Sequence, residues 1–384
     1  MKDLFKNSKF ILILIVLFAF LLRYLKFHLI DGVISTPNCA LCEDIFKFHL
    51  DFFACLKSNC LAPLNSWAIK GWYMLFKSYK FYPITISTLS CLVMYFVGKS
   101  YLVKNNSEFI ALSCSFMTAV SAYLIYNSLN SDIYSLVFLM SALVVLFSVK
   151  YYQTRYHIYL FWLIVSSILL ILCQTISFVF VIFNFISLIA FRQKSRKKSS
   201  NVMVTVIASL VLCLPIVPFL IRIFAHPTYS STWWSPFNWT NLGFYFTDLF
   251  SPVLKNLSYN DLNFYSMIIS NNSINIGFVL FALVPTSIIL FLIVKALIET
   301  KKITKYMLCA FLTTFLTVIV FVSIGKMPFL TTYLSYLYPI LILLASIGLF
   351  QIKSYSAKII LATVWSFICV FYVVAVSFSS IIAV

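Results

Sequence analysis

Residues 10–30 read FILILIVLFAFLLRYLKFHLI, an apolar run long enough to cross a membrane as a helix. A bilayer core of roughly 30 Å is spanned by about 20 helical residues. The whole chain shares this character, since it is 62% hydrophobic and 10% charged, with a mean hydropathy of +1.00. Soluble domains carry about 25% charged residues. The run has no small-residue cleavage site and further spans follow, so we interpret it as an uncleaved helix. We therefore expect an all-α polytopic membrane protein.

Further apolar runs of similar length follow along the 384 residues, and we expect about eleven transmembrane helices in total. The runs are, approximately, 10–30, 82–103, 109–126, 133–149, 158–173, 176–190, 202–224, 274–294, 307–324, 329–350 and 359–382. They leave no separate soluble domain, so we treat 1–384 as one transmembrane domain.

The distribution of Lys and Arg predicts the orientation of these helices. With the N-terminus in the cytoplasm, 18 of the 28 basic residues fall in short cytoplasmic loops. Seven of the ten acids fall on the other side. We therefore attribute the net charge of +18 to basic loop residues that set the orientation of the helices and contact anionic lipid. We expect no nucleic-acid partner.

Two extracytoplasmic loops are long, covering 31–81 and 225–273, and long loops in a compact protein usually carry function. In the first, helical spacing predicts an amphipathic interfacial helix near 43–56 and a second one in 61–80, where Pro63 suits a helix start. In the second loop, Trp233, Trp234 and Trp239 could contact a sugar or a prenyl chain, or form an aromatic belt at the headgroups.

Four of the ten cysteines lie in the first long loop: Cys39, Cys42, Cys55 and Cys60. An extracytoplasmic location favours disulfides, with three pairings allowed. Free thiols and a zinc site, which the spacing resembles, stay open as alternatives. The other six lie in predicted helices, where Cys behaves as a small buried hydrophobe.

Several motifs occur in a recognisable order. Arg23 lies near the end of the first helix, the acidic pair Glu43-Asp44 follows in the first outer loop, and then comes LAPLNSWAIKGWYMLF. The next helix opens with FYPITISTLSCL, after which SAYLIYNSLNSDIYSLVF and, near the end, TTYLSYLYPILILLASIGL appear. In this order the chain resembles the polytopic GT-C glycosyltransferases, in particular the bacterial branch similar to dolichyl-phosphate-mannose protein mannosyltransferases and aminoarabinose transferases.

The resemblance implies transfer of a sugar, with inversion, from a polyprenyl-phosphate carrier to a glycan, lipid or protein acceptor on the extracytoplasmic face. It implies catalytic roles for Asp44 or Glu43 and for Asp132. For phosphate binding we expect Arg23 and Lys326, where Lys326 substitutes for a basic residue that the family has near its C-terminus. The acidic pair is reversed relative to the family, and TTY replaces the family's C-terminal basic motif. No cofactor is certain, although a divalent cation at Asp44 and Asp132 stays open.

The chemistry is consistent with this assignment. A carboxylate can deprotonate an acceptor hydroxyl, and a cation can neutralise the departing phosphate. Two other functions stay open: a flippase or transporter of lipid-linked intermediates, and an inactive envelope assembly protein of the same fold. The Lys-, Asn-, Ile- and Phe-rich composition suggests an AT-rich bacterial genome, so we expect a bacterial plasma membrane with the active site on the extracytoplasmic face.

Overall fold

The computed structural model describes residues 7–31, 63–77, 81–101, 107–128, 134–191, 272–298, 302–323 and 331–382. These residues form α-helices and short 3-10 helices, with no strand among them. The elements are α1 (Ser8–Asp31), α4 (Pro63–Phe76), α5 (Tyr82–Ser100), α6 (Ser107–Val120), α7 (Ala122–Asn127), α8 (Tyr134–Thr154), α9 (His157–Cys173), η1 (Thr175–Ser177), α10 (Phe178–Ala190), α16 (Asn272–Ile298), α17 (Lys302–Ser323), η3 (Thr331–Leu337), α18 (Tyr338–Gln351) and α19 (Tyr355–Ile382).

Within these ranges, four stretches are long and apolar enough to cross a membrane: Ser8–Leu25, Tyr134–Thr154, Ile303–Val320 and Leu334–Gln351. Five shorter apolar helices accompany them. The all-helical fold and the membrane class predicted from the sequence agree with this arrangement. The expected span 202–224 lies outside the described residues, and the total of about eleven stays a prediction.

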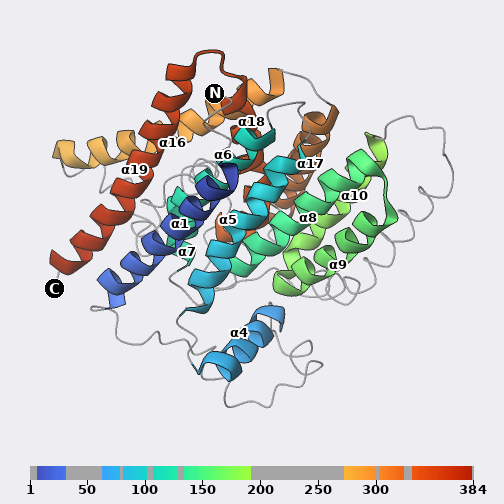
Figure 1. The fold of residues 1–384 in the computed structure, drawn as a ribbon, viewed down its shortest axis with the longest axis horizontal. Helices are drawn as coiled ribbons and strands as arrows, with labels where there is room; N and C mark the ends of the chain where they lie inside the picture. Colours follow the sequence, from blue (N-terminus) through green and yellow to red (C-terminus); the bar gives the residue numbers. More distant parts are fainter. Residues whose placement is uncertain are drawn as a thin grey trace.

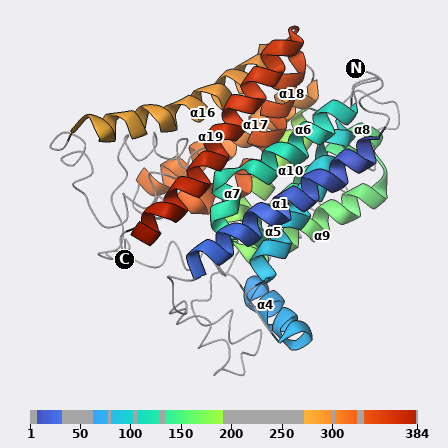
Figure 2. The same cartoon turned by 60° about the vertical axis from the view of Figure 1, so that its left-hand side comes forward.

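The helices form a bundle whose two ends can be told apart (Figure 1). We call the end where α1, α6 and α19 begin the near end, and the end where α1 and α6 finish the far end. Helix α4 lies beyond the bundle at the far end, next to the start of α5, in both views (Figures 1 and 2). It begins at Pro63, as the sequence predicts, and exposes the apolar side chains of Trp67, Met74 and Leu75. Such a helix suits a membrane interface.

The bundle has a buried centre and an apolar exterior. Helix α18 is buried from Tyr338 to Leu349, whereas α1 exposes Phe10, Ile13 and Leu17 by more than half. Exposed apolar faces of this kind are stable in lipid. Five cysteines lie in the described helices as free thiols, as expected for small apolar residues: Cys91, Cys114, Cys173, Cys309 and Cys369.

Small residues allow close helix contacts, which is typical of membrane bundles. A Cβ added at Gly348 in α18 would lie 1.8 Å from the Leu292 carbonyl oxygen in α16. A Cβ at Gly98 in α5 would lie 2.7 Å from the Ala111 Cα in α6. The backbones of both helix pairs therefore touch where a side chain is missing.

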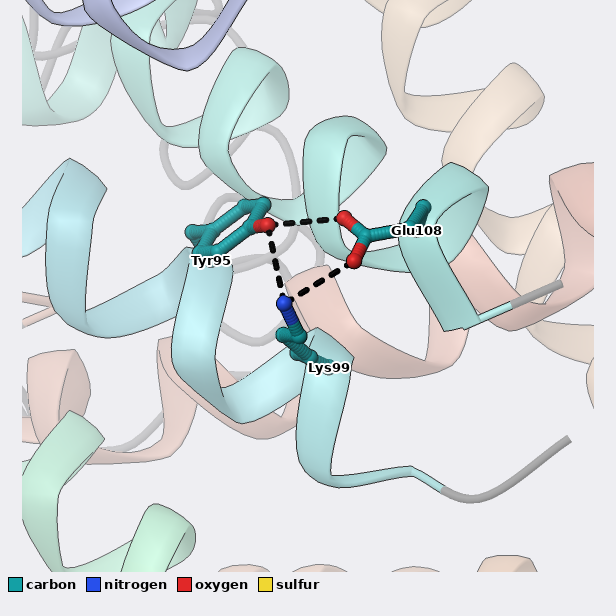
Figure 3. A network of polar contacts seen from close by, with 3 residues as sticks. All are labelled: Tyr95, Lys99 and Glu108. Atoms are coloured by element: carbon teal, nitrogen blue, oxygen red, sulfur yellow. Dashed lines mark hydrogen bonds and ion pairs between the residues drawn. The ribbon is translucent and has the colours of Figure 1, made fainter. Parts of the chain in front are cut away.

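At the near end, an ion pair links α5 to α6 (Figure 3). The Lys99 Nζ lies 2.9 Å from one Glu108 carboxylate oxygen, and the Tyr95 hydroxyl donates to the other at 2.7 Å. Burial acts to raise the pKa of Glu108, but hydrogen bonds from Lys99 and Tyr95 outweigh it and hold that pKa below its ordinary range. Glu108 lies outside the four candidate spans, and its carboxylate is ionised at neutral pH.

Candidate functional site

Most of the site residues expected from the sequence lie outside the described residues. These are Glu43, Asp44, Asp132, Lys326, the three tryptophans Trp233, Trp234 and Trp239, and the four loop cysteines Cys39, Cys42, Cys55 and Cys60. Their proposed roles stay predictions. Arg23 is described, and so are the helices that flank Asp132.

Arg23 lies inside the bundle with no exposed surface. Its Nε donates to the Ser87 Oγ at 2.8 Å, and its two terminal nitrogens donate to the carbonyl oxygens of Ala19, Ala119 and Thr118 at 3.0 to 3.2 Å. All three guanidinium nitrogens are therefore hydrogen-bonded to the protein. These bonds use four of the five guanidinium N–H groups, and the predicted phosphate role of Arg23 stays untested.

Two of the three carbonyl groups that Arg23 contacts, those of Thr118 and Ala119, lie just before a break in a helix. Ser121 separates α6 from α7 and is not helical, so carbonyls just before it lose their usual partners four residues later. Arg23 takes two of them, and the Ser121 hydroxyl forms a hydrogen bond of 2.8 Å with the Tyr338 hydroxyl of α18. Irregular backbone at membrane depth is tolerated only when protein or a polar cavity surrounds it.

Three motif segments that are distant in the sequence meet at this break. Ser87 of FYPITISTLSCL donates weakly to the Leu124 carbonyl at 3.4 Å. Tyr338 of TTYLSYLYP bonds Ser121 of SAYLIYNSLNSDIYS, 217 residues away in the chain. The rings of Tyr123 and Tyr338 also pack edge to face, with centroids 5.4 Å apart. The segments quoted for the family resemblance thus form one packed unit.

The short connection that carries Asp132 starts and ends in this unit. Asn127 ends α7, Tyr134 begins α8, and the Ser135 hydroxyl donates to the Asn127 carbonyl at 3.1 Å. This bond holds the two helix ends together. Asp132 belongs to the residues between them, so its backbone attachment points lie at the far end of the bundle.

At these helix ends lies a group of buried polar side chains that we call the far-end cluster: Tyr123, Asn127 and Ser335. Each is at most 2% exposed. The Asn127 and Ser335 side chains lie within hydrogen-bonding reach of the Tyr123 hydroxyl. Even so, the Tyr123 hydroxyl, the Asn127 side-chain nitrogen and the Ser335 hydroxyl have no partner of normal hydrogen-bond geometry within the described part of the chain. Buried polar groups are seldom left unpaired, so this cluster is suited to hold a polar ligand.

The far-end cluster can bind but has no acid, base or cation of its own. Hydroxyls and an amide can hydrogen-bond sugar hydroxyls or phosphate oxygens. Within the described ranges, no group of three His, Cys, Asp or Glu side chains could hold a metal ion. A reaction at this place would therefore require charged groups such as Asp44, Asp132 or Lys326.

Sequence reasoning pointed to the segments but not to these side chains. Tyr123, Asn127 and Ser335 lie in two of the quoted motifs, yet nothing in their spacing shows that they face one another. The sequence feature that could have pointed to them is the group of polar residues around Ser121, within an otherwise apolar run. Polar residues inside a membrane are expensive and often functional.

Comparisons with known proteins supply no family assignment: no family model matches the chain, and no curated protein is significantly similar to it. The likeness to GT-C glycosyltransferases therefore stays a prediction from the order of the sequence motifs.

Proposed function

We propose that this protein is a membrane glycosyltransferase that moves a sugar from a polyprenyl-phosphate carrier to an acceptor hydroxyl on the extracytoplasmic face. The observation that carries the proposal is the far-end cluster, whose three buried polar groups contact one another without normal hydrogen-bond geometry and lie at the helix ends that flank Asp132. The convergence of three motif segments around Ser121 supports it.

The proposal includes the topology of about eleven spans with a cytoplasmic N-terminus. The near end then faces the cytoplasm, and the far end, with α4 lying against the membrane interface, faces outward. A bacterial plasma membrane fits this arrangement. The aromatic loop residues Trp233, Trp234 and Trp239 would contact the sugar or the prenyl chain.

The reaction needs a base, a cation near the phosphate and groups that orient the substrate. Asp44, or Glu43 beside it, removes the proton of the acceptor hydroxyl. The acceptor oxygen forms a bond to the anomeric carbon from the face opposite the phosphate. The bond from that carbon to the phosphate oxygen breaks, its electron pair leaves with the phosphate, and Lys326 offsets the added charge. The far-end cluster would orient the sugar or the phosphate by hydrogen bonds.

The test uses cells that produce Asp44→Asn or Asp132→Asn protein, with Asp261→Asn as a matched change of an acid in the second long loop. Loss of transfer should remove one glycoconjugate and leave its lipid-linked sugar on the outer leaflet, where an impermeant reagent reaches it. Asp261→Asn should behave like the wild type. Unchanged glycoconjugates in both variants would reject the catalytic assignment.

The same measurement distinguishes the transferase from the second candidate function, a flippase. Loss of a flippase would leave the lipid-linked sugar on the inner leaflet, protected from the reagent. The described helices favour the transferase because Arg23 is the only charged side chain they bury, whereas transport pathways usually contain several intramembrane charges. An inactive assembly protein would show a phenotype on deletion but not in either acid variant.

A further inference from the structure

A cavity of about 430 Å³ lies between α1, α6, α16, α18 and α19, and no residue of the far-end cluster lines it. Ligand pockets commonly measure roughly 300–1,000 Å³. Its wall is almost wholly apolar and includes Ile11, Phe116, Leu292, Leu349, Trp365 and, as its one charged residue, Lys358. Tyr355 and Ile359 also line it and are each 47% exposed. The cavity therefore opens to the lateral surface of the bundle.

Lys358 gives one end of this cavity a positive charge. Its Nζ donates to the Phe350 carbonyl at 2.8 Å and lies 5.1 Å and 5.2 Å from the ring centroids of Phe109 and Phe350. Among the described residues the only ion pair is the one between Lys99 and Glu108, so no carboxylate there neutralises Lys358. An ammonium group with three donors still has capacity for an anion.

Trp365 supplies a second observation. It lines the same cavity and is 2% exposed, and its indole N–H has no hydrogen-bond partner within the described residues. Buried Trp N–H groups usually find an acceptor. Trp365 follows Lys358 by two turns of α19, a rise of about 10 Å, which is within the combined reach of the two side chains. The cavity thus combines a cation, a free N–H donor and an apolar wall.

We propose that this cavity binds one anionic glycerophospholipid of the leaflet at the near end. The phosphate pairs with Lys358, an ester carbonyl accepts the Trp365 N–H, and the acyl chains cover the apolar wall. The ester is the feature that selects this class, because a polyprenyl phosphate has no carbonyl oxygen. The site is separate from the far-end cluster and does not depend on the function proposed above.

Lipid binding to the purified full-length protein tests the site directly. After delipidation, native mass spectrometry measures binding of phosphatidylglycerol, of phosphatidylcholine with the same chains, of a polyprenyl phosphate and of inorganic phosphate. The wild type should bind phosphatidylglycerol at least about tenfold more tightly than phosphatidylcholine, as expected for a charge-assisted contact. Lys358→Gln should abolish this preference. Lys353→Gln, an exposed lysine that does not line the cavity, should preserve it.

Two further variants examine the rest of the cavity. Trp365→Phe keeps the ring but removes the N–H, and should weaken phosphatidylglycerol binding a few-fold. Ala362→Phe fills the cavity while Lys358 is intact, and should remove binding of both lipids. Two variants test the proposal if Lys358→Gln does not fold. Lys358→Arg conserves the charge and should retain the preference for phosphatidylglycerol, whereas Ala362→Phe should lose lipid binding.

Several results would overturn the proposal. Equal lipid preference in the Lys358→Gln and Lys353→Gln proteins would show that the charge does not select the lipid. Wild-type binding by Ala362→Phe would place the lipid elsewhere. Tighter binding of the polyprenyl phosphate than of phosphatidylglycerol would assign the cavity to a lipid without an ester. Competition by inorganic phosphate alone would show that the site binds a free anion and not a lipid.

Discussion

The Arg23 Nε donates to the Ser87 Oγ at 2.8 Å, which joins α1 to α5 inside the bundle. The same guanidinium holds carbonyl groups at the end of α6. One side chain thus connects three helices at the place where the helix breaks. A buried cation of this kind is tolerated because each of its nitrogens has an acceptor.

Replacing Arg23 by Met should reduce the free energy of unfolding by about 3 kcal/mol, since several buried acceptors lose their donor. Ser87→Ala should cost less, about 1 kcal/mol, because it removes one acceptor. Ser90→Ala is the control, because that hydroxyl bonds only the Ile86 carbonyl of its own helix. Unfolding in mixed micelles measures all three, and equal stability of Arg23→Met and Ser90→Ala would contradict the proposed connecting role.

Replacing glycine by alanine should have opposite effects on stability at Gly348, where α18 contacts α16, and at Gly71, where an added side chain has open space. Gly348→Ala should destabilise the protein by about 3 kcal/mol or more, because its Cβ would overlap the Leu292 carbonyl oxygen. Gly71→Ala in α4 meets nothing within 4 Å, and should stabilise by up to about 1 kcal/mol through helix propensity. Thermal unfolding of the two variants gives the comparison. A stable Gly348→Ala protein would show that the two helices are not in backbone contact.

The ion pair at the near end predicts an acid-sensitive contribution to stability. The pKa of Glu108 is lower in the folded protein than in the unfolded chain, so its contribution is complete above the ordinary carboxyl pKa of about 4.3. It is lost as the pH falls through the lower, folded value. A double-mutant cycle with Glu108→Gln and Lys99→Gln should give a coupling below about 1 kcal/mol at pH 7. The coupling should disappear at the acid end, and a constant value down to pH 3 would disprove the ionic origin.

If the far-end cluster binds the substrate, substitutions there should reduce sugar transfer without reducing the stability of the protein. Tyr123→Phe removes a buried hydroxyl whose contacts with Asn127 and Ser335 lack normal hydrogen-bond geometry, so stability should stay unchanged or rise by about 1 kcal/mol. Transfer of the sugar should nevertheless fall. Tyr338→Phe removes a hydroxyl that bonds Ser121 and should cost about 1 kcal/mol. A Tyr123→Phe protein with full transfer and wild-type lipid-linked sugar would remove the cluster from the site.

Composition alone predicts the membrane class and the helical fold, because helices satisfy their backbone groups internally and lipid offers no partner for them. Pro63 marks the start of α4 in the sequence, since proline suits the first turn of a helix. The expected spans 158–173 and 176–190 are separated by the polar residues Gln174 and Thr175, and α9 ends at Cys173. These are local properties, which neighbouring residues decide.

Tertiary structure decides which polar side chains meet. The sequence suggests a phosphate role for Arg23, but the fold surrounds the guanidinium with polar groups of α1, α5 and α6, a relation between residues up to 96 positions apart. Tyr123 and Ser335 meet only because α18 packs against the break at Ser121, and Lys358 and Trp365 share a cavity only because five helices enclose it. Hydrophobic patterning selects the buried face of each helix, whereas the pairing of those faces depends on long-range packing that no local pattern encodes.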